Sequence, residues 1–600
     1  MPILKLMIFK EETFMLKGFA FFLKQGWKYD KKYVIWLFLL QVVTAITPIA
    51  SALLPKMVID ELTGLQRIEY LILYVLLFAG WICLSSGLTS FFLKDCFTHR
   101  CRVDAAFGFE MHERLALADY SNLESPQFND MQEKAKKFLT CDYHGFGYLL
   151  DCGANILGQF ITIAGLVAIL STMEIWFLLL FAGLAAAASM IESKATKKAM
   201  LLSMEVVKHS RRWSYYAELF EQAQYGKEIR MNGMTQWLLN RERLAVSKAN
   251  ENIAQQNRCY IVSGVKRAGF TFLQQSLSYG VLIGKVLSGS LSIGSFMMCI
   301  SAVASFSAAM RNLMDRLTEI RAYDFYYIQL DEYLHIPQLL RAGKKQVLAC
   351  KEHCIEFCNV GFRYHGAENW AVRHIDLVIK PGQRLALVGE NGSGKTTLIK
   401  LLCRLYAPTE GVILLDGVDI QKYYYDQYLS QFAAVFQDFQ LFDCSIRDNI
   451  LLGKTMHDDK LDEIIEQVGL RSKVATLAQG KETTVGRRFD EEGFEPSGGE
   501  AQKIALARAL CKNAPVIILD EPTAAMDPRA EYELYRGFDS LIGEKTAVYI
   551  SHRLSVCRFC DQIAVLQHGR LIEYGTHDEL LAKQAQYAEL YKMQAQYYTE

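Results

Sequence analysis

The chain is 600 residues long, several times the length of a typical domain of about 150 residues, so we expect more than one domain. Its 65 basic and 65 acidic residues give a net charge of zero, which argues against a dedicated nucleic-acid-binding protein, because such proteins present a basic surface. Hydrophobic residues make up 51% and charged residues 22% of the chain, too apolar for a disordered protein and too polar for one that lies wholly inside a membrane. The composition therefore favours a protein that is part membrane-embedded and part soluble.

The fifteen cysteines are scattered over the chain, whereas disulfide frameworks are typical of short secreted domains. Those closest in sequence form two groups, Cys557 with Cys560, and Cys350, Cys354 and Cys358 near His353. Cys557 and Cys560 form one Cys-x-x-Cys, but neither group supplies the two such pairs that indicate a zinc site. We expect mostly free cytosolic thiols.

The first 32 residues combine lysines with aromatic side chains and lack the short apolar core and cleavage site of a signal peptide. The lysines are Lys5, Lys10, Lys17, Lys24, Lys28, Lys31 and Lys32, and the aromatic residues include Phe14, Phe19 and Phe22. Lysines can reach lipid headgroups while aromatic rings enter the interface. Residues 1–32 are therefore predicted to form an amphipathic helix on the cytosolic membrane surface.

Six apolar stretches of roughly 20 residues, the length that spans a bilayer, follow in the first half of the chain. They are residues 33–54, 70–93, 151–170, 173–193, 268–287 and 291–312. Basic residues gather after the second and fourth stretches, at Lys94, Arg100, Arg102 and Arg114, and at Lys194, Lys197, Lys198, Lys208, Arg211 and Arg212. Because basic loops stay on the cytosolic side, both termini and the two long loops are predicted to be cytosolic.

The two long loops, residues 94–150 and 194–267, contain few helix breakers, so we expect the membrane helices to continue into the cytosol. They are expected to turn at Ser125-Pro126 and near Tyr225-Gly226. After Leu340 a polar linker leads into short apolar strands that alternate with helices, the pattern of an α/β domain. The predicted parts are an interfacial helix (1–32), an all-α membrane domain of six long transmembrane helices (33–335), a linker (336–350) and an α/β domain (351–600).

A glycine-rich loop follows the predicted strand Arg384–Val388 and precedes a helix, the context in which the pattern GxxxxGK[ST] binds phosphate. The residues of the loop and the helix start are Gly389, Glu390, Asn391, Gly392, Ser393, Gly394, Lys395, Thr396 and Thr397. Glycines let backbone N–H groups point inward, and the helix N-terminus adds its positive dipole. We expect Lys395 to reach the β- and γ-phosphates of a nucleoside triphosphate and the Thr396 hydroxyl to bind Mg²⁺.

A second apolar run, from Pro515 to Leu519, is typical of a buried parallel strand and ends in two acids, Asp520 and Glu521. In P-loop NTPases the aspartate at this position holds Mg²⁺. Successive side chains of a strand point to opposite faces, so Glu521 is placed to accept a proton from the attacking water as a general base.

Between these motifs lies Pro496-Ser497-Gly498-Gly499-Glu500, directly before a predicted helix, and the three motifs in this order resemble the ATP-binding cassette superfamily. The resemblance implies ATP and Mg²⁺ as cofactors. It also implies that Tyr364 stacks on adenine and that Gln437 contacts Mg²⁺ and the attacking water and faces the membrane domain. Asp527 matches an acid at the dimer interface, and His552 matches the switch histidine that contacts the γ-phosphate.

In this superfamily two cassettes dimerise head to tail, so that ATP would lie between the phosphate loop of one subunit and Ser497, Gly498 and Gly499 of the other. The commonest form of this segment is Leu-Ser-Gly-Gly-Gln, from which the chain departs at Pro496 and Glu500. An acid favours a helix N-terminus but repels a nearby phosphate. We expect Glu500 to face away from the phosphate and to tune the rate.

Six spans before one cassette resemble an exporter-type half-transporter, over nearly the whole chain. The resemblance implies a multi-pass protein of a bacterial plasma membrane that works as a homodimer or heterodimer by alternating access. It implies export of a hydrophobic or amphipathic small molecule or peptide. Polar residues within the spans are candidates for substrate contact, namely Gln274, Gln275 and Arg311.

Three other functions share parts of this pattern. The spans exclude a soluble P-loop ATPase, and a membrane ATPase switch without transport would be expected to lack Glu521 or His552. Import of a chelated metal stays open, because some transporters of this architecture act as importers.

Overall fold

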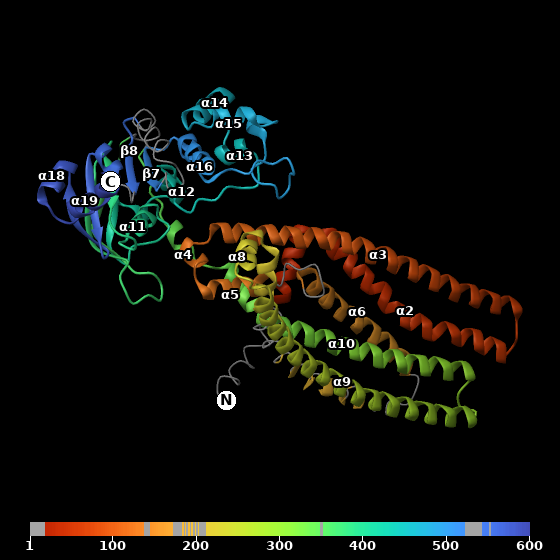
Figure 1. Cartoon of the computed structure of the whole chain (residues 1–600). Coiled ribbons are helices and arrows are strands. Elements are labelled where there is room, and N and C mark those ends of the chain that lie inside the picture. The colour runs from red at the N-terminus through yellow and green to blue at the C-terminus, as the bar shows by residue number, and fades with distance from the viewer. Residues whose placement is uncertain are drawn as a thin grey trace. The chain divides into compact units, whose positions relative to one another are not determined.

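The computed structural model describes residues 18–136, 145–171, 212–348, 352–521, 543–550 and 554–599, together with short stretches between residues 183 and 202. These residues fall into two compact units (Figure 1). The first comprises Met1–Ala116 and Asp130–Ile336, and the second comprises Leu117–Asn129 and Pro337–Glu600. The tip of the first long loop thus belongs to the C-terminal unit, although both of its ends continue into the first unit.

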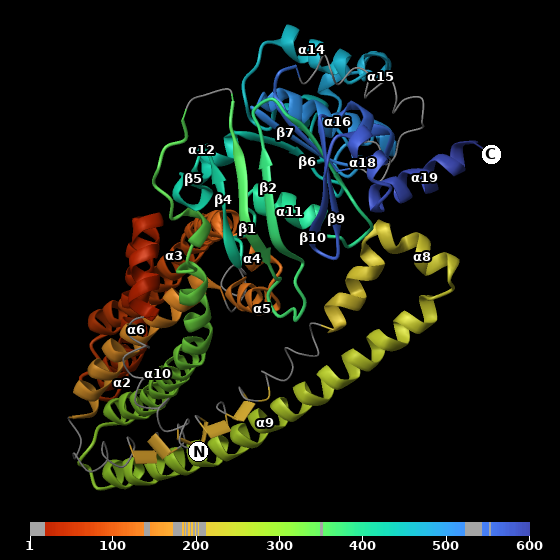
Figure 2. The same ribbon diagram turned by 90° about the vertical axis from the view of Figure 1, so that its left-hand side faces the viewer.

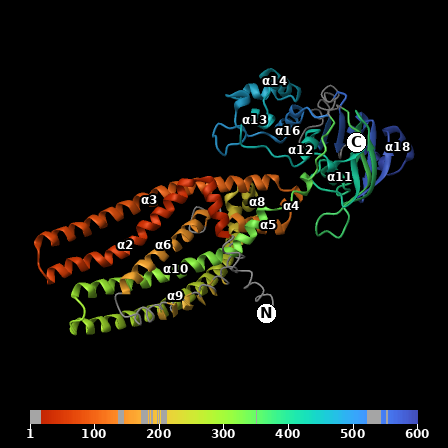
Figure 3. The ribbon, with the colours of Figure 1, turned by 180° about the vertical axis from the view of Figure 1, so that it is seen from behind.

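The first unit is helical, as predicted, and α2, α3, α6 and α10 run side by side in it (Figures 1 and 3). Its helices are α2 (Lys31–Thr63), α3 (Ile68–Leu117), α6 (Phe146–Leu170), the 3₁₀ turn η2 (Ala223–Tyr225), α8 (Gly226–Met231), α9 (Thr235–Leu287) and α10 (Ile293–Leu334). Helix α2 begins after Asp30, whose carboxylate accepts hydrogen bonds from the backbone N–H groups of Lys32 and Tyr33 at 3.0 and 3.3 Å. This is the usual way in which a side chain caps a helix N-terminus.

Four of the described helices are long and apolar enough to cross a membrane. These segments are Lys31–Thr63, Ile68–Leu117, Phe146–Leu170 and Ile293–Arg321, and they contain the predicted spans 33–54, 70–93 and 151–170 and nearly all of 291–312. The predicted span 173–193 lies largely outside the described residues. The predicted span 268–287 forms the end of α9, which is not among the four. A helical part with apolar membrane-crossing helices is therefore confirmed, and a count of six is not.

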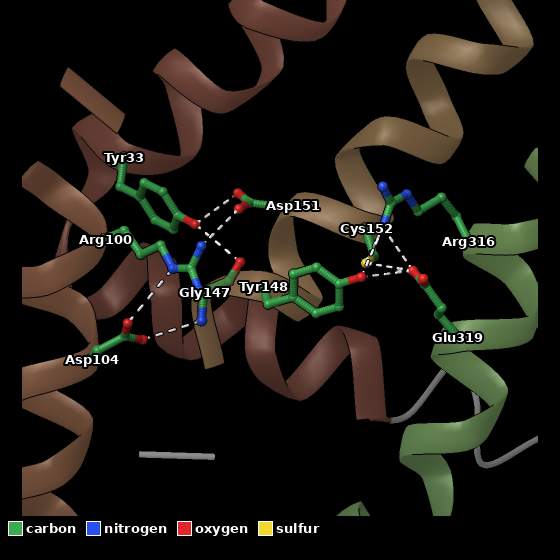
Figure 4. Close-up of polar contacts among 9 residues, drawn as sticks. All are labelled: Tyr33, Arg100, Asp104, Gly147, Tyr148, Asp151, Cys152, Arg316 and Glu319. Carbon is green, nitrogen blue, oxygen red and sulfur yellow. Dashed lines mark hydrogen bonds and ion pairs between the residues drawn. The ribbon is translucent and has the colours of Figure 1, made fainter. Parts of the chain in front are cut away.

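The first turns of α6 carry two clusters of paired polar side chains (Figure 4). In the first cluster, the Tyr33 hydroxyl donates to Asp151 at 3.0 Å and to the Gly147 carbonyl at 3.1 Å. Arg100 lies 3.4 Å from Asp151 and 3.7 Å from Asp104, which also accepts the Gly147 N–H at 3.1 Å. A Cβ at position 147 would lie 2.5 Å from the Arg100 side chain, so a larger residue there would displace Arg100 from its present position. The cluster joins α2, α3 and α6.

The second cluster joins α6 to α10 (Figure 4). Glu319 accepts hydrogen bonds from Arg316 at 2.7 Å and from the Tyr148 hydroxyl at 2.9 Å. Cys152 lies 3.5 Å from the same carboxylate oxygen. Charges removed from water are tolerated only when they are paired and hydrogen-bonded, so these pairs fix how the helices pack against one another.

The second unit is the predicted α/β domain and contains two sheets (Figure 2). The antiparallel sheet has the order β2-β1-β4-β5, with β1 (Ile355–Phe362), β2 (Val372–Ile379), β4 (Glu410–Leu415) and β5 (Val418–Asp419). The other has the order β10-β9-β3-β8-β7-β6, with β3 (Arg384–Val388), β6 (Phe432–Val435), β7 (Val516–Asp520), β8 (Thr546–Ile550), β9 (Gln562–Gln567) and β10 (Arg570–Gly575).

The helices of this unit form most of its remaining structure. They are α4 (Tyr120–Leu123), α11 (Lys395–Leu402), α12 (Tyr425–Ser430), α13 (Ile446–Leu451), α14 (Asp458–Gln467), α15 (Arg471–Thr476), α16 (Gly498–Lys512), α18 (His577–Lys583) and α19 (Gln586–Thr599), while α5 (Pro126–Ala135) continues into the first unit. Strands β6, β7, β8 and β3 are parallel neighbours, and β7 and β8 are buried along their whole length. Their carboxyl ends therefore meet at one edge of the sheet, where ligands bind in folds of this kind.

A buried arginine anchors the linker to this unit. Arg404 is fully buried and donates to the backbone carbonyls of Leu340, Gln421 and Tyr423 at 2.5, 3.2 and 3.0 Å. The buried Asp119 accepts the N–H groups of Leu339 and Leu340 at 2.8 and 3.3 Å. The loop tip, the linker and the end of α11 are thus hydrogen-bonded to one another.

We expect Arg404→Met to destabilise the C-terminal unit by about 2–4 kcal/mol, because it leaves three buried carbonyls without a donor. The matched control is Arg341→Met, since Arg341 pairs at 3.1 Å with the exposed Asp426 and such surface pairs contribute about 1 kcal/mol or less. Thermal unfolding of the purified full chain would measure both. Equal shifts of the unfolding midpoint would contradict the assignment of Arg404 as the anchor.

Candidate functional site

The predicted phosphate loop connects β3 to α11 at the carboxyl edge of the parallel strands. Lys395, the first residue of α11, is 5% exposed. Its ammonium group donates to the carbonyls of Gly389 and Glu390 at 2.8 and 2.9 Å. Burial lowers the pKa of Lys395, while the nearby carboxylates of Glu521 and Asp520 act in the opposite direction. A cation held inside a glycine loop by neutral carbonyls is well placed to turn to phosphate oxygens.

The loop conformation requires glycine at two positions. Gly389 has φ of 151° and Gly394 has φ of 103°, in the range that side chains disfavour. A Cβ on Gly389 would lie 2.2 Å from the carbonyl oxygen of Leu566, and one on Gly394 would lie 2.8 Å from that of Ala371. The backbone at both positions packs so closely that no larger residue fits without rearrangement.

Asp520 ends β7 beside the start of α11. It is 2% exposed, and its carboxylate lies 3.4 Å from the Thr396 hydroxyl. Burial, followed by the nearby charge of Glu521, raises the pKa of Asp520 to about 6, although the Thr396 hydroxyl and Lys395 act to lower it. A carboxylate that is this costly to keep charged gains from a nearby cation.

These oxygen atoms fit a magnesium ion. Mg²⁺ is usually bound through one or two carboxylates together with hydroxyl groups, water and substrate phosphates, rather than by a cage of protein ligands. Asp520 and Thr396 supply one carboxylate and one hydroxyl at adjoining positions. The part of the chain that the structure describes holds no group of three or more His, Cys, Asp or Glu residues with the spacing of a metal cage.

Glu521 follows Asp520 and leaves the strand in a strained conformation. Its φ is +50°, in the left-handed region, which costs a non-glycine residue about 1–3 kcal/mol. Its N–H donates to the Ile550 carbonyl at 2.9 Å, and its own carbonyl accepts from the Gln502 amide at 3.0 Å. Its carboxylate accepts the Gln437 amide at 2.9 Å. Three segments of the chain thus hold Glu521, two through its backbone and one through its carboxylate.

Tyr364 contacts α11 one residue after Thr396. Its hydroxyl is 3.1 Å from the Thr397 hydroxyl, and its ring packs edge-on against Phe362 and Tyr406, with centroid distances of 4.9 and 5.5 Å. Tyr364, which is expected to stack on adenine, thus contacts the same helix that carries Lys395 and Thr396, which are expected at the phosphates.

The Ser-Gly-Gly segment begins α16, with Ser497 as its N-cap residue and Gly498 and Gly499 in the first turn. Glu500 turns back on this end of the helix, where one carboxylate oxygen accepts the backbone N–H and the hydroxyl of Ser497, both at 2.8 Å. Its other oxygen lies 3.5 Å from Lys473. Glu500 therefore acts as a helix cap here, an arrangement known as a capping box.

The structure brings together most of the residues expected around the phosphates. The phosphate loop leads into α11, Asp520 and Tyr364 contact this helix at Thr396 and Thr397, and Gln437 contacts Glu521 next to Asp520. The polar partners of Ser497 among the described residues belong to its own helix end rather than to the phosphate loop. Asp527 and His552 lie outside the described residues.

Sequence reasoning missed Gln502, whose amide holds the Glu521 carbonyl. The signal for it was available, because Gln502 is a polar residue two positions after Glu500 on a helix whose other positions are largely apolar. Its contact with Glu521 depends on the packing of α16 against the end of β7, and a motif does not show that.

Comparison with known proteins agrees with these motifs. Residues 372–524 match the family model described as "ABC transporter". The subtilin transport ATP-binding protein SpaT of Bacillus subtilis is 26% identical over 584 residues, covering 95% of this chain and 93% of that protein. An ATP-dependent lipid A-core flippase of Bordetella avium is 35% identical over 321 residues, covering 52% of this chain and 53% of that protein.

The fold is also similar to a solved structure. A bacterial Atm1-family ABC exporter with ATP bound aligns with a TM-score of 0.79 at 22% identity, covering 94% of this chain and 99% of the other. The similarity extends over both units, so the order of a helical part followed by a cassette is shared. The chain thus carries an ABC transporter domain fused to a helical membrane part, and over nearly its whole length it is similar to a transport ATP-binding protein and, in fold, to an ABC exporter.

Proposed function

We propose that this chain is half of a dimeric exporter that moves an amphipathic molecule, either a peptide or a lipid-like compound, across a bacterial plasma membrane. As an ABC transporter it couples ATP hydrolysis to transport. The proposal is carried by the site at which Lys395, Asp520, Glu521 and Gln437 lie together. The same chain holds helices that are long and apolar enough to cross a membrane.

The substrate class is inferred from relatives. SpaT is named for transport of subtilin, and NisT of Lactococcus lactis, 26% identical over 95% of both chains, is named for transport of nisin. The flippases are named for lipid A-core. The peptide transporters match this chain along nearly its whole length, whereas the flippase match covers about half, so we favour a peptide substrate.

The membrane domain in this proposal has six spans, the two additional ones being residues 173–193 and 268–287, with both termini in the cytosol. The boundaries proposed for the parts of the chain are 1–32, 33–335, 336–350 and 351–600. Two half-transporters, identical or different, place Ser497, Gly498 and Gly499 of one against the phosphate loop of the other. Ser497 and Gly498, at this end of α16, are exposed.

In the proposed mechanism Lys395 leaves the carbonyls of Gly389 and Glu390 for the phosphates of ATP. Thr396, Asp520 and Gln437 would hold Mg²⁺, whose positive charge would offset that of the phosphates. Glu521 accepts a proton from the attacking water, and the Gln437 amide orients its carboxylate. Tyr364 stacks on adenine, Asp527 lies at the dimer interface and His552 contacts the γ-phosphate.

The first test is the ATPase rate of the purified chain alone in lipid nanodiscs. A steady rate that depends on Mg²⁺ is expected of a working homodimer, and the rate then serves to screen peptides and lipids. A folded chain that hydrolyses no ATP, alone or with a co-purified partner, would contradict the proposal.

Glu521→Gln should slow hydrolysis by about 10²- to 10⁴-fold, the usual loss for a missing general base, while ATP binding stays near that of the parent. The amide keeps the shape of the side chain and its contact with Gln437, so folding is retained. Single-turnover hydrolysis and equilibrium binding of ATP check the two parts. Hydrolysis at the parent rate would remove Glu521 from this role.

Lys395→Ala should weaken ATP binding itself by at least about tenfold, since a charge-assisted hydrogen bond to phosphate contributes about 1.5–3 kcal/mol. The control is Lys422→Ala, an exposed lysine of the same domain, which should bind ATP as the parent does. Binding is measured with a fluorescent ATP analogue. Parent-like affinity of the Lys395 variant would rule out the phosphate-loop assignment.

A further inference from the structure

The hydroxyl of Ser497 is engaged by an acid of its own helix. Glu500 lies in the first turn of α16, and one of its carboxylate oxygens accepts both the backbone N–H and the hydroxyl of Ser497 at 2.8 Å. The serine oxygen in turn accepts the Glu500 N–H at 3.4 Å. A hydroxyl carries a single proton and so donates to one acceptor at a time. In this structure that acceptor is Glu500.

A lysine holds the carboxylate in this position. The other oxygen of Glu500 lies 3.5 Å from the ammonium group of Lys473 on α15, and this ammonium lies 4.9 Å from the ring centre of the buried Phe494. Partial burial acts to raise the pKa of Glu500, but hydrogen bonds from Ser497 and the charge of Lys473 lower it. Glu500 is therefore ionised at neutral pH. Hydrogen bonds to an ionised acceptor are among the stronger ones.

In the proposed dimer the same hydroxyl has a second acceptor. The γ-phosphate of an ATP molecule held by the other subunit can accept a hydrogen bond from Ser497 only if the hydroxyl proton leaves Glu500. The phosphate is also negatively charged, so it is repelled by a carboxylate at this position but not by the uncharged amide of the commoner glutamine. Closure of the site onto Ser497 therefore costs more with Glu500 than it would with glutamine.

We propose that Glu500 is a positioning residue that competes with the γ-phosphate for the Ser497 hydroxyl and so sets the ATP concentration at which two cassettes close. The inference rests on the proposed function, because it takes Ser497 to face the phosphate loop of another subunit. It concerns the affinity of closure rather than the chemistry of hydrolysis, for which Glu521 is the expected base. Removing the charge of Glu500 should weaken the helix cap and yet favour closure, which no merely structural role would do.

The variants separate this competition from capping. Glu500→Gln keeps the size of the side chain and an oxygen for the Ser497 N–H, and it removes the charge. Glu579→Gln is the matched control, because Glu579 accepts the Thr576 N–H at 2.9 Å in the capping box that begins α18 of the same unit. Ser497→Ala, alone and combined with Glu500→Gln, shows whether the effect of Glu500 passes through the hydroxyl.

The steady-state ATPase rate of the full chain in nanodiscs, measured against ATP concentration in excess Mg²⁺, separates KM from kcat. In Glu500→Gln the KM for ATP should fall by about three- to tenfold, the effect of removing one competing hydrogen bond. In Glu579→Gln both constants should stay within about twofold of the parent, as for a surface substitution. Ser497→Ala should raise KM, and adding Glu500→Gln to it should change KM by less than about twofold.

Two sets of results would overturn the inference, and they can be told apart. If Ser497→Ala raises KM but Glu500→Gln behaves as Glu579→Gln does, or lowers KM equally with and without the Ser497 hydroxyl, the competition is wrong and the proposed function stands. If Ser497→Ala has the KM and kcat of the parent, Ser497 does not contact the γ-phosphate, and the proposed dimer arrangement fails together with the inference.

Discussion

The nucleotide site depends on the register of four parallel strands. Leu387 pairs with Ile550, Ile550 with Asp520, and Leu519 with Val435, so the ends of β3, β8, β7 and β6 are level with one another. Side chains alternate along a strand, and a slip of one residue would exchange the directions of Asp520 and Glu521. The burial of β7 and β8 on both faces fixes this register, because any slip would also displace apolar side chains from the core.

The strain at Glu521 follows from that register. Asp520 has to stay in the strand to face Thr396, while the next residue has to leave it to meet Gln437, and the turn between them requires a left-handed conformation. The hydrogen bond from the Glu521 N–H to the Ile550 carbonyl and the one from the Gln502 amide to the Glu521 carbonyl offset this cost. Strained residues that are held from several sides are typical of functional sites, where position matters more than local stability.

The features that depend only on which residues follow one another along a short stretch of chain could be predicted from the sequence. The phosphate loop, the two acids and the Ser-Gly-Gly segment were identified because glycines, a strand and a helix follow one another at fixed spacing. The α/β class and the helical part followed from hydrophobic periodicity and span length. The roles of Asp527 and His552 are predicted from their sequence motifs alone.

Other features depend on contacts between distant segments and were not predictable in this way. The contact of Glu124 with Tyr406 joins positions 282 residues apart, and no local pattern marks either residue. The capping role of Glu500 required the geometry of the helix end, since the sequence alone suggested only that it should avoid phosphate. The count of six spans rested on hydropathy. The end of α9, residues 268–287, contains polar side chains such as Gln274 and Gln275, and this helix is not among those described that are apolar enough to cross a membrane.

Each unit holds its own ends of the segments that connect the two units. In the C-terminal unit both segments are held close to α11: Arg404 binds the Leu340 carbonyl of the linker, and Asp119 of the loop tip binds the N–H groups beside it. In the first unit the pairs in Figure 4 join α3, which leads to the loop tip, to α6, and α6 to α10, which leads to the linker. The two connections are therefore tied to one another by hydrogen bonds and ion pairs inside each unit, rather than by the covalent chain alone.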